Sequence, residues 1–219
     1  MGSERVQHYR MRYSHKHKFI LINNWKCGCT SLCHMFAGYC EPVGEIDWSS
    51  HFDYYSVKAR FRHPPAREIK KAFAEKGWDF DEYIKIISVR NPWARIVSLY
   101  SYHKSKWDKI SSFSKYVKEY VPRWQAGVLR SPRWNTREMI HDYDGASLVD
   151  YVVRLENLKE DLSPIIEKHF PDFYINYNIR KNSTEHDHYS TYYNEHTKSI
   201  VADLYHYDIE KWGYKFEEE

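Results

Sequence analysis

The stretch that most constrains the fold is Tyr83–Val89, with the sequence YIKIISV. It is rich in β-branched residues and almost wholly apolar, which is typical of a strand buried on both faces of a parallel sheet. A similar run, Lys18–Ile22, lies nearer the N-terminus. Strand–loop–helix units recur along the chain, so the sequence predicts an α/β fold of three layers, with a mostly parallel central sheet flanked by helices.

Helical signals follow each of the two strands. After the second strand, Asn91 is a good N-cap and Pro92 occupies the first helical position, where its missing N–H costs nothing. Residues 105–146 are polar, aromatic and poorly periodic, and we expect them to form short helices and loops that cover a substrate. The pattern of apolar residues predicts further helices at Ser31–Tyr39, Ala66–Lys76, Leu158–Phe170 and Glu195–Trp212.

Length and charge limit the classes of partner. The 219 residues fit one domain, 1–219, in which residues 1–17 are expected to be a flexible or peripheral segment. A net charge of +3 is too slight for a nucleic-acid-binding surface, so no nucleic-acid partner is expected. No apolar run approaches the length of a membrane span and no signal-peptide core is present, which favours a soluble, cytoplasmic protein. The oligomeric state stays open.

The first candidate site follows the strand Lys18–Ile22. Lys26, Gly28, Thr30 and Ser31 come in quick succession and lead into a predicted helix. Backbone N–H groups, a helix dipole, two hydroxyls and a cation together would hold a phosphate or sulfate. The order differs from a Walker loop, in which the lysine follows the second glycine. A solvated loop lysine is the alternative interpretation.

The same stretch contains all four cysteines of the chain. Their bunching makes a long-range disulfide framework an unlikely design and fits a reducing compartment. A zinc site that includes His34 is an alternative, although the spacing lacks the paired knuckles of a zinc ribbon. The residues concerned are Cys27, Cys29, Cys33 and Cys40.

The second candidate site follows the strand Tyr83–Val89. Arg90 stands at the tip of the strand, and Ser98 comes two helical turns after the Asn91 cap, about 10 Å along the helix axis. A guanidinium and a hydroxyl in this arrangement can hold one phosphate along the flank of the helix. The alternative is a surface arginine with an ordinary mid-helix serine.

Both stretches resemble motifs of the sulfotransferases that use 3′-phosphoadenosine 5′-phosphosulfate (PAPS). Lys26–Ser31, KCGCTS, is similar to their 5′-phosphosulfate loop, and Arg90–Tyr100 matches every named position of their 3′-phosphate motif, RxPxxRxxSxY. Val153–Leu158 and Tyr205–Phe216 resemble stretches of the carbohydrate-type and bacterial branch. The resemblance therefore extends from about residue 18 to residue 216 and implies the P-loop-NTPase-like fold of that superfamily.

The resemblance also implies an activity and its residues. The co-substrate would be PAPS, the product adenosine 3′,5′-bisphosphate, and the acceptor a small molecule or carbohydrate with a hydroxyl or amine; no metal is implied. Lys26 would stabilise the leaving phosphate, and Arg95 is expected to face solvent or a carboxylate. The residues that would bind the nucleotide are Lys26, Cys27, Gly28, Cys29, Thr30, Ser31, Arg90 and Ser98.

An acceptor hydroxyl needs a base with a pKa near neutrality, and histidine suits that role. His63 is the first candidate, because it resembles the histidine that precedes the corresponding helix in bacterial relatives; His51 and His103 are the other candidates. A structural cap is the alternative role for His63, and Glu156 is expected to be structural. A nucleotide-dependent kinase and a non-enzymatic anion-binding module remain alternative functions.

Overall fold

The computed structural model describes residues 12–41, 63–106, 110–125, 136–181 and 186–217. Within these residues one sheet of four strands is present, in the order β1-β2-β3-β4. β1 is antiparallel to β2, whereas β2, β3 and β4 run parallel to one another. The strands are β1 (Arg12–Ser14), β2 (Phe19–Ile22), β3 (Ile84–Val89) and β4 (Tyr151–Arg154).

The register of the parallel strands brings the two candidate loops to the same edge of the sheet. Ile22, the last residue of β2, pairs with Ile87, which is two residues before the end of β3. The chain therefore leaves both neighbouring strands at their carboxyl ends within a few ångströms, because paired strands lie about 4.8 Å apart. Ligands of open parallel sheets collect at this edge.

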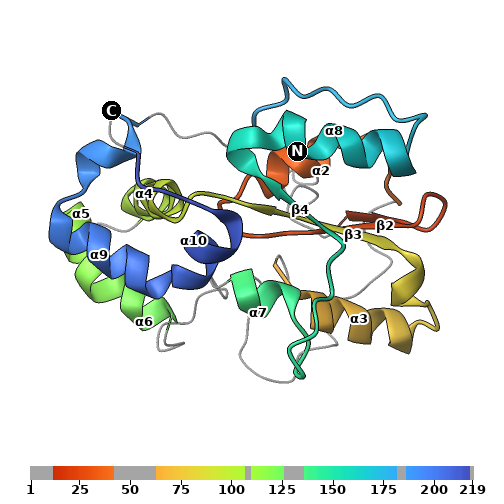
Figure 1. Ribbon diagram of the computed structural model, residues 1–219, viewed down its shortest axis with the longest axis horizontal. Coiled ribbons are helices and arrows are strands. Elements are labelled where there is room, and N and C mark those ends of the chain that lie inside the picture. Colours follow the sequence, from red (N-terminus) through yellow and green to blue (C-terminus); the bar gives the residue numbers. More distant parts are fainter. Residues whose placement is uncertain (1–11, 42–62, 107–109, 126–135, 182–185, 218–219) are drawn as a thin grey trace.

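Helices cover both faces of the sheet (Figure 1). Alternate side chains of β2 and β3 point to opposite faces: Leu21 and Ile86 pack against α2 and α8, whereas Ile20 and Ile87 pack against α3 and α7. This alternation confirms the prediction of an α/β protein with helices on both faces. The helices are α2 (Cys29–Met35), α8 (Leu158–His169), α3 (Ala66–Glu75) and α7 (Thr136–Ile140).

A helical half lies beyond the carboxyl ends of the strands, at the left of Figure 1. Its core includes Phe113 and Tyr116, so these aromatic residues of the 105–146 region serve packing. Among the described residues, no helix is both apolar enough and long enough to cross a membrane. The elements of this half are α4 (Pro92–Lys104), α5 (Phe113–Lys115), the π-helix η4 (Tyr116–Tyr120), α6 (Val121–Gln125), α9 (Glu195–Leu204) and α10 (His206–Trp212).

Most predicted elements are present, with shifts at their ends. The strand and helix around Asn91 and the helix Ala66–Glu75 agree closely with the prediction. The segment Glu195–Trp212 is two helices, because the chain bends at Tyr205. β4 was not predicted, and β1 lies within the segment expected to be peripheral. The described 3₁₀ turns are η1 (Ala37–Tyr39), η3 (Phe80–Glu82), η5 (Leu155–Asn157) and η6 (Tyr189–Tyr192).

Candidate functional site

The two loops predicted to bind phosphate are in direct contact. Arg90 follows β3, and its Nη1 donates a hydrogen bond to the backbone oxygen of Lys26, at 3.3 Å. Arg95, one turn into α4, donates from Nε to the backbone oxygen of Trp25, at 3.0 Å. The structure thus brings Lys26 and Arg90 together, as the positions of the two strands predict.

The loop that carries Lys26 has an unusual backbone. Lys26 has a φ of 61° and Gly28 a φ of 76°, so both occupy the left-handed region. A non-glycine residue there is strained, and such residues concentrate at functional sites. A Cβ at Gly28 would also meet Cδ1 of Leu155, so the end of that side chain would have to shift. The positive φ favours glycine at the start of α2, and the close approach of Leu155 adds to that preference.

Two lysines lie against Tyr102 on α4. Nζ of Lys26 lies 5.0 Å from the centre of the Tyr102 ring, and Nζ of Lys106 lies 3.8 Å from it and 2.6 Å from the Tyr102 hydroxyl. Burial and the charges of Arg90 and Lys106 together lower the pKa of Lys26 to about 8. An anion bound here would relieve this repulsion, so the cluster of Lys26, Arg90 and Lys106 favours an anionic ligand.

Arg90 is partly buried at the start of α4, where the carboxylate of Glu156 lies close to it. Burial lowers the pKa of Arg90, whereas attraction to Cys27 and Glu156 raises it. Oε1 of Glu156 accepts a hydrogen bond from the backbone N–H of Asn91 at 2.8 Å, and Oε2 accepts one from the hydroxyl of Tyr214 at 3.3 Å. Glu156 therefore has the structural role that the sequence predicts.

The hydroxyl groups of the site have different surroundings. Oγ of Ser31 accepts a hydrogen bond from the backbone N–H of Lys181 at 2.9 Å and lies 3.5 Å from the oxygen of the same residue. Ser31 thus fastens a distant segment to the start of α2, which leaves it less able to bind a ligand than predicted. Ser98 is buried in α4, on the same helix face as Tyr102.

Two of the four cysteines, Cys27 and Cys33, are buried, whereas Cys29 and Cys40 are partly exposed. Burial raises the pKa of Cys27 to about 12 and that of Cys29 to about 11, so both thiols are protonated at neutral pH. Sγ of Cys33 lies 3.3 Å from Oδ1 of Asn23, and Sγ of Cys40 lies 3.2 Å from the oxygen of Phe36. In the described part of the chain, no group of three or more His, Cys, Asp or Glu residues is arranged to hold a metal.

Of the candidate bases, His63 lies beside the Lys26 loop. Its Nδ1 is 3.2 Å from the backbone oxygen of Asn23, and its ring stacks on Trp25 with the ring centres 6.1 Å apart. His103 is buried with Nδ1 2.7 Å from the hydroxyl of Tyr116. Burial, Lys26 and Lys106 lower the pKa of His103 to about 3, which makes it a poor proton acceptor. His51 lies outside the described residues.

The sequence predicts solvent or a carboxylate beside Arg95; the carboxylate is present as Asp208, whereas exposure to solvent is wrong for Arg95. Its side chain is 1% exposed, and Nη2 donates a hydrogen bond to Oδ1 of Asn24 at 3.0 Å. Asp208 is a buried carboxylate that attracts Arg95, and burial raises the pKa of Asp208. Arg95 lies beneath the Lys26 loop, on a stretch of α4 in which every residue from Pro92 to Tyr100 is buried.

Sequence reasoning missed Tyr102 and Lys106. Tyr102 follows Ser98 by four residues, which places it on the same face of α4. Lys106 follows Tyr102 by another four residues and lies just past the end of the helix. This spacing was the signal that was available in the sequence. The two residues extend the candidate site along α4.

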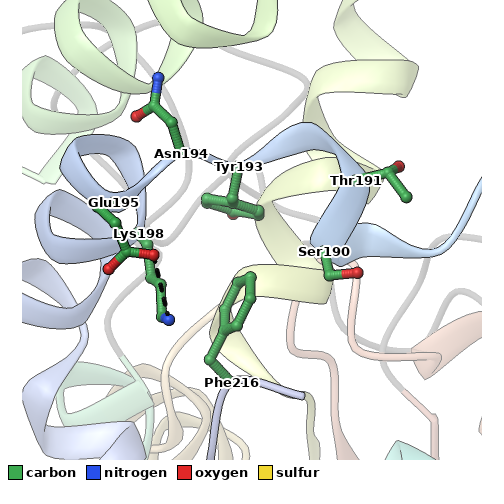
Figure 2. Close-up of a pocket in the computed structure, with 7 residues that line it drawn as sticks. All are labelled: Ser190, Thr191, Tyr193, Asn194, Glu195, Lys198 and Phe216. Carbon is green, nitrogen blue, oxygen red and sulfur yellow. Dashed lines mark ion pairs between the residues drawn. The ribbon is translucent and has the colours of Figure 1, made fainter. Parts of the chain in front are cut away.

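A separate cavity of about 250 Å³ lies between η6, the start of α9 and the C-terminal segment (Figure 2). In Figure 2 the rings of Tyr193 and Phe216 lie near each other at its centre, and Lys198 is ion-paired with Glu195 at 3.5 Å. Nζ of Lys198 also lies 4.5 Å from the centre of the Phe216 ring. Ser190, Thr191 and Asn194 also line the cavity. None of its lining residues belongs to the Lys26 site.

Comparison with known proteins gives one informative match. No model of a known protein family matches the chain. A protein of Archaeoglobus fulgidus with the name "uncharacterized protein" is 33% identical over 90 residues, which are 41% of this chain and 69% of the archaeal protein. The chain belongs to the family of this archaeal protein. The name of the relative assigns no activity, so the function has to be argued from the site.

Proposed function

We propose that the protein is a PAPS-dependent sulfotransferase with the P-loop-NTPase-like fold of that superfamily. It would move the sulfuryl group from PAPS to a hydroxyl or amine of a small-molecule or carbohydrate acceptor. The observation that carries the proposal is the hydrogen bond from Arg90 to the oxygen of Lys26, because it joins the two stretches that resemble the 5′- and 3′-phosphate motifs.

The residues at the site fit a doubly phosphorylated nucleotide. Arg90 and Ser98 would bind the 3′-phosphate, whereas Lys26, Thr30 and the backbone N–H groups of residues 28–31 would bind the 5′-phosphosulfate; the N–H of Cys27 already donates to the oxygen of Asn24. The largest influences on the pKa of Lys26 are burial and neighbouring cations and thiols, with no carboxylate among them. The site therefore has the excess of positive charge that such a ligand requires.

Lys26 is suited to stabilise the leaving group. Negative charge builds up on the phosphate oxygen as its bond to sulfur breaks and the new bond from sulfur to the acceptor forms. A cation fixed in a partly buried place lowers the energy of that state more than a solvated one does. The approach of the anion also raises the pKa of Lys26 above about 8, so the ammonium stays protonated during transfer.

His63 is suited to take the proton of the acceptor. Because Nδ1 lies against the backbone oxygen of Asn23, Nδ1 carries the hydrogen and Nε2 is the basic nitrogen. The stacked ring of Trp25 holds the imidazole beside the loop of Lys26. Under this proposal the acceptor proton passes to Nε2 as the sulfur–oxygen bond to the acceptor forms.

Calorimetry with adenosine 3′,5′-bisphosphate and with ATP tests the proposal. We expect tight binding of the bisphosphate that is independent of Mg²⁺, and much weaker binding of ATP, because ATP has no 3′-phosphate for Arg90. Binding of ATP that requires Mg²⁺ would favour a kinase instead. Absence of bisphosphate binding would contradict the proposal.

A further inference from the structure

The backbone of Lys26 is held on both sides by two arginines of one segment. Arg95 donates to the carbonyl oxygen of Trp25, the residue before Lys26, at 3.0 Å, and Arg90 donates to the carbonyl oxygen of Lys26 itself, at 3.3 Å. Lys26 itself has a φ of 61°. A strained conformation of this kind persists only when the surrounding structure fixes it.

Arg95 has contacts that make it a rigid support. Its Nη2 donates to Oδ1 of Asn24 at 3.0 Å, and Nδ2 of Asn24 donates to the backbone oxygen of Ser88 in β3, at 3.1 Å. The guanidinium also lies 5.9 Å from the centre of the Tyr205 ring. Two consecutive residues before Lys26 are thus fastened through Arg95 to α4 and to the sheet.

A buried carboxylate lies in the same region. Oδ1 of Asp208, in α10, accepts a hydrogen bond from the hydroxyl of Thr136, which lies 3.5 Å from Nδ2 of Asn24. Asp208 attracts Arg95 electrostatically. The charge of Arg95 is therefore partly balanced inside the protein, so the arginine need not turn toward a ligand.

We propose that Arg95 is a positioning residue: through the carbonyl of Trp25 and the side chain of Asn24 it holds Lys26 in its left-handed conformation, with the ammonium against Tyr102 and next to Arg90. The consequence for catalysis rests on the proposed function. The consequence for the conformation of Lys26 does not, and it is measurable without any substrate.

The reactivity of the Lys26 amine shows whether its side chain lies against Tyr102 and next to Arg90. Lys26 faces Arg90 from the β3–α4 turn, Lys106 from the end of α4 and the thiols of Cys27 and Cys29 from its own loop. Burial, Arg90 and Lys106 lower the pKa of Lys26 to about 8 from 10.5, and the two thiols oppose part of this shift. A Lys26 side chain that swings into solvent loses this environment, and its pKa returns toward 10.5.

The experiment is competitive labelling of lysines with acetic anhydride over a range of pH, read for each peptide by mass spectrometry. In the unchanged protein we expect half-maximal reactivity of Lys26 at about pH 8. In Arg95→Lys, which keeps the charge but loses the paired donors, we expect the midpoint to move toward 10.5. Arg123→Lys, an exchange at an exposed position of α6, should leave the midpoint unchanged.

Lys85 is an internal control for general loosening of the fold. It is buried in β3, and its Nζ lies 3.1 Å from Asp150, so its labelling stays slow as long as the sheet is intact. An unchanged Lys26 midpoint in folded Arg95→Lys would overturn the proposal. If Arg95→Lys does not fold, Asn24→Ala removes the side-chain acceptor Oδ1 of Asn24 from Arg95, and a smaller shift of the Lys26 midpoint in the same direction is expected. Absence of that shift overturns the proposal.

Binding of adenosine 3′,5′-bisphosphate distinguishes a failure of the positioning role of Arg95 from a failure of the proposed sulfotransferase function. If the unchanged protein binds the nucleotide, Arg95→Lys should weaken binding even though Arg95 does not touch the ligand. If the unchanged protein does not bind it, the sulfotransferase assignment fails, whereas a shifted Lys26 midpoint still supports the positioning role.

Discussion

The two loops at the edge of the sheet are stabilised in opposite ways. The β3–α4 turn is stabilised locally: the side chain of Asn91 accepts hydrogen bonds from the N–H groups of Trp93 and Ala94, and Pro92 begins the helix. The β2–α2 loop has no side-chain cap at Gly28, and both Lys26 and Gly28 have positive φ. The start of α4 has a cap from its own sequence in addition to the distant contacts of Asn91 with Glu156 and Lys215, whereas the start of α2 has no side-chain cap.

The difference shows how the site is assembled. The rigid β3–α4 segment supplies Arg90 and Arg95, which hold two successive carbonyls of the strained loop. The β3–α4 segment therefore supports the conformation of the β2–α2 loop. Substitutions that disturb the β3–α4 segment should change the conformation of both loops, whereas substitutions in the β2–α2 loop should leave α4 intact.

The largest effect is expected from removal of the cation that the two loops share. Arg90→Ala should weaken binding of adenosine 3′,5′-bisphosphate by about 3.5 kcal/mol, or several hundredfold, because a partly buried phosphate contact is lost. Isothermal titration calorimetry measures the change. Arg123→Ala, at an exposed position, is the matched control. Equal affinities of the two variants would remove Arg90 from the site.

The next prediction tests the strained loop. Gly77 has a φ of 71° and open space around it, so Gly77→Ala should cost only the backbone penalty, about 1 kcal/mol of unfolding free energy. Gly28→Ala should cost about 2.5 kcal/mol, because crowding against Leu155 is added. Urea denaturation measures both values, and the double variant with Leu155→Ala should reduce the crowding part. Equal costs for the two glycines would contradict the close approach.

The third prediction concerns pH. The pKa of Lys26 is lowered to about 8, so the free protein loses this charge as the pH rises through that value. A bound phosphate holds the proton, and affinity should therefore be constant at neutral pH and fall by about tenfold per unit well above pH 8. Lys26→Met should abolish this dependence. The same slope in Lys26→Met would assign it to another group.

The smallest effect is expected from loss of the cap of α4 in the β3–α4 turn. Asn91→Ala removes the cap of α4 and the hydrogen bond from Nδ2 to the oxygen of Lys215, and should lower the free energy of unfolding by about 1 kcal/mol. Asn91→Ser, which can still cap, should recover most of it. Urea denaturation distinguishes the two. If both variants lose the same amount, the cap is not what stabilises the turn.

Local rules explain why part of the fold could be predicted. β3, the Asn91 cap and α3 depend on neighbouring residues, such as the spacing of Ile69, Ala72 and Phe73, all of which are buried. β1 and β4 were missed because their short sequences, RYS and YVVR, lack the continuous apolar run that marks the equally short β2, FILI. Their place in the sheet depends on pairing with distant residues.

The site was predictable in outline for the same reason. Lys26 and Arg90 were found because each follows a strong strand. The role of Arg95 was not found, because α4 is buried on nearly all sides and its sequence has no polar face that separates ligand-facing from core positions. The hydrogen bonds of Arg95 join residues about seventy positions apart, and no local pattern predicts them.

The most direct test of the account is a crystal structure of the protein with adenosine 3′,5′-bisphosphate. The account predicts one nucleotide across the two loops, with its 3′-phosphate on Arg90 and Ser98 and its 5′-phosphate on Lys26 and the start of α2. A nucleotide bound elsewhere, for example in the cavity beside Phe216, or one that touches only one of the two loops, would contradict it.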